Sequence, residues 1–346
     1  MSRSAKTPLW ARLAVTLGCL LLLLPALVAR AGHAGSRAEI DGPLNMLLVG
    51  IDPRGSHTIP LADTIVVAHV PADRSRVYLF SLPRDLVVQI PAFAASGSPA
   101  QRAKINAAMA LGSRTGPASF SPAQGFQLLS QTVREVTGIP KFDAGAIINF
   151  GGFTKLVAAM GGVKMVIDQD VASEHRKPDG SPRDRLPECQ GHHRCLRPYT
   201  GEQKIYHRSD KPVRLSAWEA LDYVRQRYGL PRSDYDRQRH QRQFLTAVAK
   251  RVSRDPAELP RLVAAVGDSL TLVDGGHSLT AWAGELQGLR ARHVTAIDLP
   301  GSALFENGRY LGEQYPDGVR QFFAAVVEDR VARFLLDHPG HVNIDE

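Results

Sequence analysis

Cysteine is scarce in this sequence, and acidic residues are outnumbered by basic ones. The 346 residues include three cysteines, and 34 acidic residues stand against 42 lysines and arginines, which gives a formal charge of +8. No internal repeat recurs along the chain, so a repeat architecture is excluded. The positive charge favours an anionic partner, either nucleic acid, an anionic membrane surface or a phosphorylated substrate.

The longest apolar run lies near the N-terminus and is flanked by basic residues. It covers 17 residues, from Leu13 to Ala29, and as a helix it would span roughly 25 Å, close to the thickness of a membrane core. No lipid-box cysteine follows, and Arg30 fits poorly in a cleavage site, so a transmembrane signal anchor is favoured. A cleaved signal peptide is the alternative. Either way, the rest of the chain lies outside the cytoplasm.

The predicted layout is that of a single-pass cell-membrane protein. It comprises a cytoplasmic N-terminus (1–12), the anchor (13–30), a linker (31–42) and one extracytoplasmic domain (43–340). Export makes nucleic acid an improbable partner. It also permits a disulfide between Cys189 and Cys195, which would contribute about 2 kcal/mol. The alternative is a zinc site that includes His192 and His193, but ligands packed this closely rarely enclose one ion without a second, distant pair.

Beyond residue 43, strand and helix patterns alternate, which predicts an α/β fold. The apolar runs at 45–52, 64–70, 76–82, 142–149, 163–167 and 294–299 predict strands, and the periodicities at 121–138, 153–160, 216–224, 234–254 and 317–337 predict helices. Residues 172–214 are rich in proline, glycine and charge and predict a long surface loop. No linker is long enough to split the domain.

Two aspartates lie at the ends of neighbouring predicted strands. Asp52 ends one strand and Asp63 directly precedes the next. If these strands pair, both carboxylates lie at one rim of the sheet, where a magnesium ion could join them to phosphate oxygens. Taken alone, the pair is better explained by turn aspartates that bind local backbone. Arg54 and Arg84 project from the same predicted rim, although a lone arginine at a strand end is usually a surface charge.

A basic cluster follows at the end of one predicted helix and the start of the next. Arg225 and Arg227 end the first helix, and Arg237 and Gln241 share one face of the second at i and i+4. Arginine binds phosphate oxygens through two parallel hydrogen bonds. A solvated basic helix or a nucleic-acid-binding helix is the other reading, and the interleaved Asp234 argues against the latter.

Six motifs then occur in order, and together they resemble the LytR–CpsA–Psr family of bacterial cell-wall ligases. They are Asn45-Met-Leu-Leu-Val-Gly-x-Asp52-x-Arg54, Ala62-Asp63-Thr64, Ser81-Leu-Pro-Arg84-Asp85, Lys104-Ile-Asn106, Asn149-Phe-x-x-Phe with Gly-Gly-Val163, and Tyr-Val-Arg225-x-Arg227 with Asp234-x-x-Arg237-x-x-x-Gln241. The resemblance covers residues 44–254 closely and the remainder more loosely.

The resemblance implies a central mixed β-sheet flanked by helices that enclose a hydrophobic polyprenyl-binding cavity. It implies that Asp52 and Asp63 bind Mg²⁺, or alternatively Mn²⁺. It further implies pyrophosphate contacts, and the residues at these positions are Arg54, Arg84, Arg225, Arg227, Arg237 and Gln241. Asp234 and Arg237 are the predicted catalytic residues, with Asp234 as the candidate base; a metal-bound group could do the same work.

Two positions depart from the family pattern. His240 stands where the family often has arginine, so one positive charge is either missing or dependent on pH. Leu61 and Ala62 replace the usual Arg-Ser before Asp63, which puts a secondary contact in doubt.

The implied activity is transfer of a phosphoglycan, such as a teichoic acid, capsule or arabinogalactan-like polymer, from a polyprenyl-pyrophosphate carrier to a peptidoglycan hydroxyl. Hydrolysis of the same carrier is an alternative, since the same residues would serve with water as acceptor. A non-catalytic lipid-glycan binding or regulatory protein is a second alternative. A DNA-binding regulator is opposed by the apolar N-terminal run.

Overall fold

The computed structural model describes residue 40 and residues 42–52, 59–189, 198–255, 258–277, 281–282, 285–286, 289 and 293–343. Within these ranges no helix is both long and apolar enough to cross a membrane. The predicted anchor at 13–30 and most of the predicted linker lie outside them. Internal contacts divide the chain into two compact units: the sheet unit, Met1–Gly152 with Ala249–Glu346, and the helix unit, Phe153–Val248.

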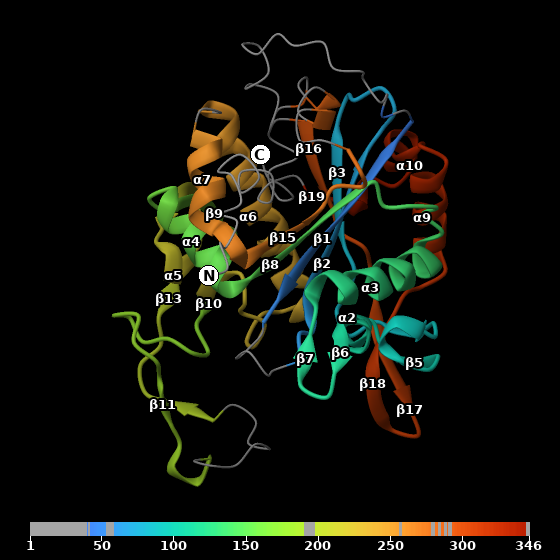
Figure 1. Ribbon diagram of the computed structural model, residues 1–346. Helices are drawn as coiled ribbons and strands as arrows, with labels where there is room; N and C mark the ends of the chain where they lie inside the picture. The colour runs from blue at the N-terminus through green and yellow to red at the C-terminus, as the bar shows by residue number, and fades with distance from the viewer. Residues whose placement is uncertain are drawn as a thin grey trace, which may run out of the picture. The chain divides into compact units, whose positions relative to one another are not determined.

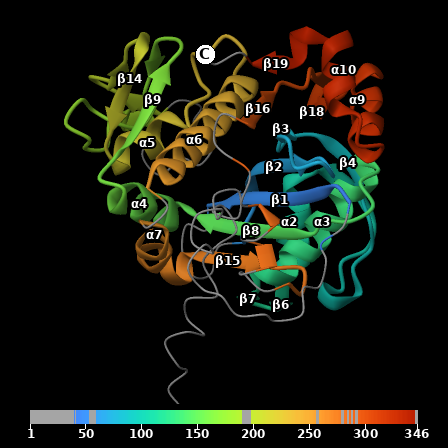
Figure 2. The same ribbon diagram turned by 90° about the horizontal axis from the view of Figure 1, so that it is seen from above.

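A mixed seven-stranded sheet forms the centre of the sheet unit (Figure 1). Its order is β15 (Leu270–Val273), β8 (Ala144–Asn149), β1 (Leu44–Ile51), β2 (Ala62–Val70), β3 (Val77–Ser81), β16 (Val294–Ile297) and β19 (Val342–Asn343). Figure 2 shows the strands from β15 to β16 in this sequence. β2 is antiparallel to β1 and β3, whereas β8 is parallel to β1 and β16 is parallel to β3. The predicted central mixed sheet is confirmed.

One face of this sheet packs against four helices in a single hydrophobic cluster. The helices are α2 (Asn106–Ser113), α3 (Pro122–Thr137), α9 (Gly318–Val327) and α10 (Val331–Asp337). Phe80 of β3 meets Phe322 of α9 edge to face, with ring centroids 5.0 Å apart, and burial of each such ring contributes about 2–3 kcal/mol. On β1, Leu47 belongs to this cluster, while Met46 and Leu48 are also buried. Because side chains alternate along a strand, β1 is covered on both faces.

The boundaries of α3 follow directly from its sequence. The Ser121 hydroxyl accepts a hydrogen bond from the Gln124 N–H at 3.3 Å, and Pro122 occupies the first turn, where its missing N–H costs nothing. The helix ends at Gly138, whose φ of 73° is the left-handed conformation that glycine adopts without strain. Gly125 lets α2 approach closely, because a Cβ there would lie 2.6 Å from the Met109 carbonyl oxygen.

Three short hairpins and a further helix complete the described part of the sheet unit. The hairpins are β4 (Val87–Ile90) with β5 (Gln101–Lys104), β6 (Arg114–Gly116) with β7 (Ser119–Phe120), and β17 (Ser302–Glu306) with β18 (Arg309–Gln314), and the helix is α7 (Leu259–Val266). Single 3₁₀ turns lie at Ala94–Ser96, Gly267–Ser269 and Pro339–His341.

The helix unit contains the predicted elements in a different sheet arrangement. Its main elements are α4 (Phe150–Ala159), β9 (Val163–Ile167), β14 (Ser209–Leu215), α5 (Ala217–Tyr223) and α6 (Asp234–Arg254). The alternation of strands and helices predicted an α/β fold, and within it β9 does not join the central sheet but pairs with β14 in a separate two-stranded sheet. Both borders between the units fall inside helices, α4 and α6.

The predicted surface loop at 172–214 contains short paired strands. β10 (Val171–Ala172) pairs with β13 (Ile205–Tyr206), and β11 (Asp184–Arg185) pairs with β12 (Tyr199–Thr200). The buried Asp222 carboxylate of α5 accepts hydrogen bonds from the Tyr206 hydroxyl at 2.9 Å, the Ser173 hydroxyl at 3.0 Å and the Gln226 amide at 2.8 Å. Burial raises the pKa of Asp222, and the hydrogen bonds from the Ser173 and Tyr206 hydroxyls oppose the change. The loop is therefore pinned to α5 at its base.

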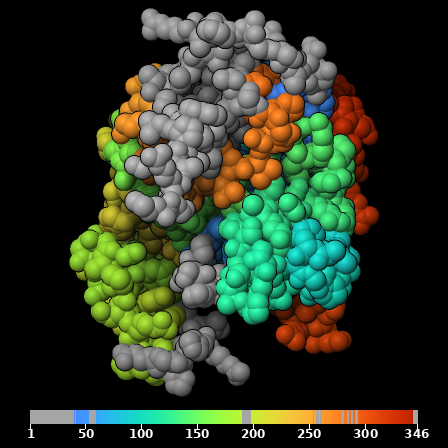
Figure 3. Space-filling view, in the orientation of Figure 1, coloured from blue at the N-terminus to red at the C-terminus, as the bar shows by residue number. Residues whose placement is uncertain are grey.

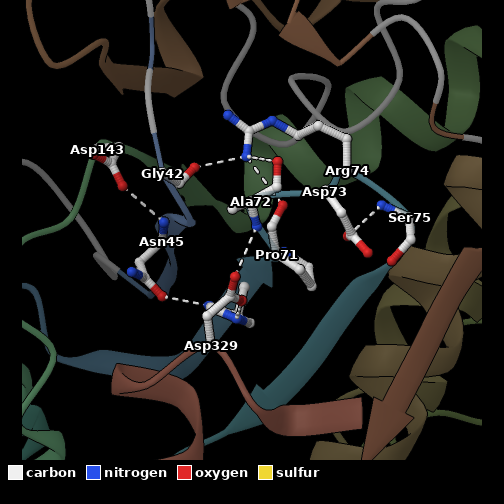
Figure 4. Close-up of polar contacts among 10 residues, drawn as sticks. Gly42, Asn45, Pro71, Ala72, Asp73, Arg74, Ser75, Asp143 and Asp329 are labelled. Carbon is white, nitrogen blue, oxygen red and sulfur yellow. Dashed lines mark hydrogen bonds and ion pairs between the residues drawn. The ribbon is translucent and has the colours of Figure 1, made fainter.

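The prediction of one final helix over 317–337 is wrong, because α9 and α10 are separated at Asp329. Its φ of 53° is left-handed, which ends α9. The Asp329 carboxylate lies 3.1 Å from the buried His69 Nε2 and accepts the Ala72 N–H at 3.0 Å, and His69 Nδ1 lies 2.9 Å from Asn45 Oδ1 (Figure 4). Burial lowers the pKa of His69, whereas Asp329 opposes this effect. The break between α9 and α10 thus ties these two helices to the C-terminal end of β2.

Asp329→Ala is expected to lower the free energy of unfolding by about 1–3 kcal/mol, because it removes the partner of a buried imidazole and of a backbone N–H. Urea denaturation of the purified protein measures this. Asp329→Asn, which tolerates the left-handed backbone, should lose less. Asp317→Ala is the matched control: its side chain is 95% exposed, so a change within about 0.5 kcal/mol is expected. Equal losses in Asp317→Ala and Asp329→Ala would contradict the assignment.

Candidate functional site

Both predicted metal-binding aspartates lie at one edge of the central sheet. Asp52 directly follows β1, and Asp63 is the second residue of the antiparallel neighbour β2. Gly50 pairs with Thr64 and Ile51 with Ala62, so Asp63 is the extra residue of a β-bulge. Bulges re-aim a side chain at the end of a ladder and are common beside functional sites. Strand register therefore supplies the placement that the sequence could only suggest.

Arg84 follows β3 and reaches the same edge. Its Nη1 lies 2.5 Å from Asp63 Oδ1, and the two side chains are 19% and 21% exposed. The chain between β3 and Arg84 is short and contains Pro83, and the Leu82 N–H donates to the Ile65 carbonyl at 2.9 Å. The guanidinium is therefore held at the strand end by both its backbone and its carboxylate partner.

Asp85 and Lys104 complete this cluster, although sequence reasoning gave neither a role. Asp85 Oδ2 lies 3.7 Å from Arg84 Nε, and Asp85 Oδ1 lies 3.0 Å from Lys104 Nζ. Lys104 ends β5, and the next residue, Ile105, donates its N–H to the Leu86 carbonyl at 2.8 Å. Both residues occur in the ordered motifs, which was the available signal. The carboxylate edge denotes these five residues: Asp52, Asp63, Arg84, Asp85 and Lys104.

The donor chemistry of the carboxylate edge suits a hard divalent cation. Magnesium usually takes one or two protein carboxylates and completes its shell with water and substrate oxygens. Among the residues that the structure describes, no group of three or more His, Cys, Asp or Glu side chains is placed to hold a metal. Arg54, a predicted pyrophosphate contact, belongs to residues 53–58, outside the described ranges.

In the helix unit, Arg237 and Asp234 form an ion pair in the first turn of α6. Arg237 Nη2 lies 2.6 Å from Asp234 Oδ1, and the Gln238 amide donates to Asp234 Oδ2 at 3.2 Å. Arg237 is only 6% exposed, so a charge at this position requires a partner. The acidic residue also lies where the helix dipole favours negative charge. Asp234, a predicted base, is thus bound to the arginine beside it.

Gln241 connects α6 to the other two predicted arginines. Its side-chain amide donates to the Val224 carbonyl at 3.4 Å, and Arg225 and Arg227 follow directly after α5. The Arg227 guanidinium lies 4.8 Å from the Tyr228 ring centroid and donates to the Tyr228 hydroxyl at 2.9 Å. All four predicted phosphate-binding side chains of the helix unit therefore come from the α5 end and the first turns of α6.

His240 does not supply a charge at the surface. It is fully buried, its ring stacks on Tyr223 with centroids 4.4 Å apart, and its Nε2 lies 3.4 Å from Asp168 Oδ1. Burial lowers the pKa of His240, although Asp168 opposes the shift. Of the two outcomes left open by the sequence, the structure therefore favours a missing positive charge at neutral pH.

Asp168, which sequence reasoning missed, anchors α6 to the end of β9. Its Oδ2 lies 2.8 Å from Arg239 Nε and accepts the Gln243 amide at 2.8 Å. Burial favours the neutral acid, but the contacts with His240, Arg239 and Gln243 hold the pKa of Asp168 at about 2. The signal in the sequence was weak, because Asp168 follows an ordinary strand and its partners lie more than 70 residues away.

The predicted disulfide lies partly outside the described ranges. Cys189 is buried at the end of a 3₁₀ turn, Pro187–Cys189. Cys195 and the two alternative zinc ligands, His192 and His193, belong to residues 190–197, which the structure does not describe. The pairing stays a prediction.

Comparison with known proteins identifies relatives of this chain. The family model of the LytR_cpsA_psr family matches residues 29–324. Cell wall biosynthesis protein LcpA of Corynebacterium glutamicum is 27% identical over 303 residues, which cover 78% of this chain and 52% of that protein. A polyisoprenyl-teichoic acid–peptidoglycan teichoic acid transferase TagU of Bacillus cereus is 25% identical over 209 residues, 60% of this chain and 52% of that one. The chain thus spans about half the length of these relatives.

Solved structures share the fold. TagT bound to LI-WTA superposes with a TM-score of 0.57 at 21% identity, over 87% of this chain and 95% of TagT. At this identity the likeness concerns the fold.

Asp168→Asn should destabilise the protein by about 1–2 kcal/mol at pH 7, because charge-assisted contacts to α6 are weakened. The carboxyl titrates near 3.8 in the unfolded chain and at about 2 in the folded one, so its stabilisation is complete above about pH 4 and is lost as the pH falls towards 2. Urea unfolding at several pH values measures this. The difference from wild type should shrink below pH 4. The control is Asp210→Asn, with a side chain 92% exposed; a difference that persists unchanged at pH 2 would refute the assignment.

Proposed function

Because the chain belongs to the LytR_cpsA_psr family, we propose that it is a membrane-anchored, extracytoplasmic phosphotransferase of the cell wall. It moves a phosphoglycan from a polyprenyl-pyrophosphate carrier to a hydroxyl group of peptidoglycan. The observation that carries the proposal is the half-buried pairing of Arg84 with Asp63 at the carboxylate edge. The printed names of its relatives, a cell wall biosynthesis protein and a teichoic acid transferase, support the same reaction class.

Asp52 and Asp63 are the proposed magnesium ligands, with manganese as a substitute. When bound there, the cation would neutralise the pyrophosphate, which two carboxylates alone would repel. Arg84 shares Asp63 with the proposed metal site, so the same edge offers a divalent cation and a guanidinium to one anionic group. Arg54 is proposed as a further phosphate contact on the basis of its motif.

Arg225, Arg227, Arg237 and Gln241 are proposed to bind the pyrophosphate oxygens. A planar guanidinium matches the phosphate group through two parallel hydrogen bonds. Preorganisation supports this role, since Arg237 is already held by Asp234 at 2.6 Å and costs little reorganisation when charge develops on the leaving group. In the step itself, the acceptor oxygen bonds to phosphorus as the bond to polyprenyl phosphate breaks.

The acceptor hydroxyl must lose its proton in this step, and Asp234 has two possible tasks. As a general base it would take the proton directly. Its ion pair with Arg237 and its hydrogen bond from Gln238 support a positioning role instead. We infer that Asp234 mainly orients Arg237; a divalent cation held by Asp52 and Asp63 would supply the acidity that lets the acceptor hydroxyl release its proton.

The polyprenyl chain is proposed to lie against an apolar interior face of the central sheet. The face of the sheet that does not belong to the four-helix cluster carries Met46, Leu48, Val66 and Ala68, all buried. Such apolar side chains suit an isoprenoid tail. The predicted anchor at 13–30 would hold the protein at the membrane that supplies this lipid.

Arg237→Ala and Asp63→Ala are expected to reduce turnover strongly, by about 10³-fold or more for the arginine. The assay uses the full chain in detergent with a polyprenyl-pyrophosphate glycan, peptidoglycan oligomers and Mg²⁺, and measures release of polyprenyl phosphate. Chelation should abolish wild-type turnover. Matched controls are Arg251→Ala on the same helix, 45% exposed, and Asp73→Ala in the β2–β3 turn.

Each outcome of that assay separates the rival functions. Release that requires the oligomers indicates transfer, release without them indicates a hydrolase, and binding without release indicates a regulatory protein. Turnover that resists chelation, or that is equal in both site variants and both controls, would disprove the metal–arginine mechanism.

Asp234→Asn should lower kcat while the shape of the pH–rate profile stays unchanged, because the amide still contacts Arg237 but orients it less firmly. Turnover of the variant between pH 5 and 9 measures this. If Asp234 is the general base, the variant should instead lose the acidic limb of the profile. Gln238→Ala, which removes only the hydrogen bond to Asp234, should show a milder form of the same change.

A further inference from the structure

A β-hairpin with two exposed aromatic rings adjoins the carboxylate edge. β17 and β18 are joined by Asn307 and Gly308, whose φ angles of 50° and 74° are those of a tight hairpin turn. Phe305 and Tyr310 stand directly opposite each other on the two strands, 59% and 42% exposed, with ring centroids 5.7 Å apart. The register shifts between Leu304 and Phe305 because Leu311 is an extra residue on β18, and such a bulge re-aims the side chains beside it.

Backbone contacts pin this hairpin to the segment that carries Arg84. The Glu313 N–H of β18 donates to the Asp85 carbonyl at 2.8 Å, and Leu86 forms a parallel bridge with Glu313. Gly312 makes the approach possible, because a Cβ there would lie 2.2 Å from the Asp85 carbonyl oxygen. β18 also contacts β4, and in Figure 3 the orange-red surface of the hairpin adjoins the cyan surface of the chain segment that contains β4.

Side-chain contacts continue from the candidate metal ligand to the rings. Asp63 contacts Arg84, Arg84 contacts Asp85, and Asp85 contacts Lys104. Lys104 Nζ in turn lies 5.2 Å from the Tyr310 ring centroid, within the range of a cation–π contact. A ligand that rests on Tyr310 would therefore extend towards the carboxylate edge.

The charges around the rings are balanced, and several of them are paired. Arg102 contacts Glu306 at 2.6 Å, Lys104 contacts Asp85, and the Tyr310 hydroxyl donates to Glu313 at 2.7 Å. With Arg309, three cations stand against three carboxylates. Such a surface does not attract a polyanion, which argues against the phosphoglycan donor and against nucleic acid. It suits a neutral, hydroxyl-rich ligand whose apolar ring face stacks on an aromatic side chain.

We propose that the β17–β18 hairpin is the acceptor subsite, which binds the N-acetylated sugar rings of a peptidoglycan glycan strand. This inference rests on the proposed function. Phe305 and Tyr310 stack on the sugar faces, and the paired polar groups bind hydroxyl and acetamide groups. The acceptor strand then lies beside the carboxylate edge, with a sugar hydroxyl directed at the phosphoryl group.

The test measures acceptor and donor kinetics separately in the full chain. Tyr310→Ala and Phe305→Ala should each raise the KM for oligomers of N-acetylglucosamine and N-acetylmuramic acid about three- to tenfold, which corresponds to the loss of one ring contact. The donor KM, and any donor hydrolysis without acceptor, should stay unchanged. Tyr310→Phe, which keeps the ring, should restore most of the loss. Leu336→Ala is the control, a large hydrophobic residue of the same unit that is 75% exposed.

A binding measurement keeps this inference distinguishable from the proposed function. Saturation-transfer NMR with the same oligomers and no donor should give signals for wild type and Leu336→Ala that weaken in both ring-deletion variants. If wild type shows no transfer but binds oligomers through the rings, the proposed function fails and the subsite stands. An unchanged acceptor KM together with unchanged binding, or a rise in donor KM alone, would overturn the subsite.

Discussion

A positively charged side chain that is withdrawn from water must be paired, and this constraint organises both candidate clusters. Arg84 is held by Asp63, and Arg237 by Asp234. Arg239 is held in the same way by Asp168. Burial of an unpaired guanidinium would cost several kcal/mol. The carboxylates therefore define where each cation can lie, before any ligand is considered.

The same pairing suits the proposed chemistry. A guanidinium that is already fixed loses little conformational freedom when it meets a phosphate group, so more of its attraction is available to the transition state. A carboxylate that contacts both a divalent cation and an arginine, as is proposed for Asp63, holds both positive charges close to the same anionic ligand. The sheet supports this arrangement, because β1 and β3 run in the same direction, and β2 begins at the edge where they end. The hairpin bound to Asp85 extends that edge with a surface of a different chemical kind.

The structure differs from the sequence-based predictions where an element depends on contacts with residues far away in the chain. The periodicity of 317–337 is continuous, and the break at Asp329 depends on His69 and Ala72, which lie more than 250 residues earlier. The β-α-β pattern around α4 is genuine, but β9 finds its partner in β14, on the far side of a long loop. For His240 the sequence left open a missing or a pH-dependent charge, and the burial of its ring against Tyr223, which bears on that choice, could not be read from the local pattern. Local pattern carries no information about any of these partners.

The sequence by itself determined the main strands and helices from β1 to α6, the caps of α3 at Ser121 and Gly138, and the ordered motifs that contain the candidate site residues, because these depend on neighbours within a few residues. It also contains an apolar run from Leu13 to Ala29 ahead of the described domain. Only the tertiary structure decided that Asp63 occupies a bulge beside β1 and pairs with Arg84. It likewise decided that Asp234 binds Arg237, and that an aromatic hairpin 200 residues away joins the loop after β3. Such contacts bring together residues distant in the chain, and their energies depend on register, burial and charge pairing, which exist only once the chain has folded.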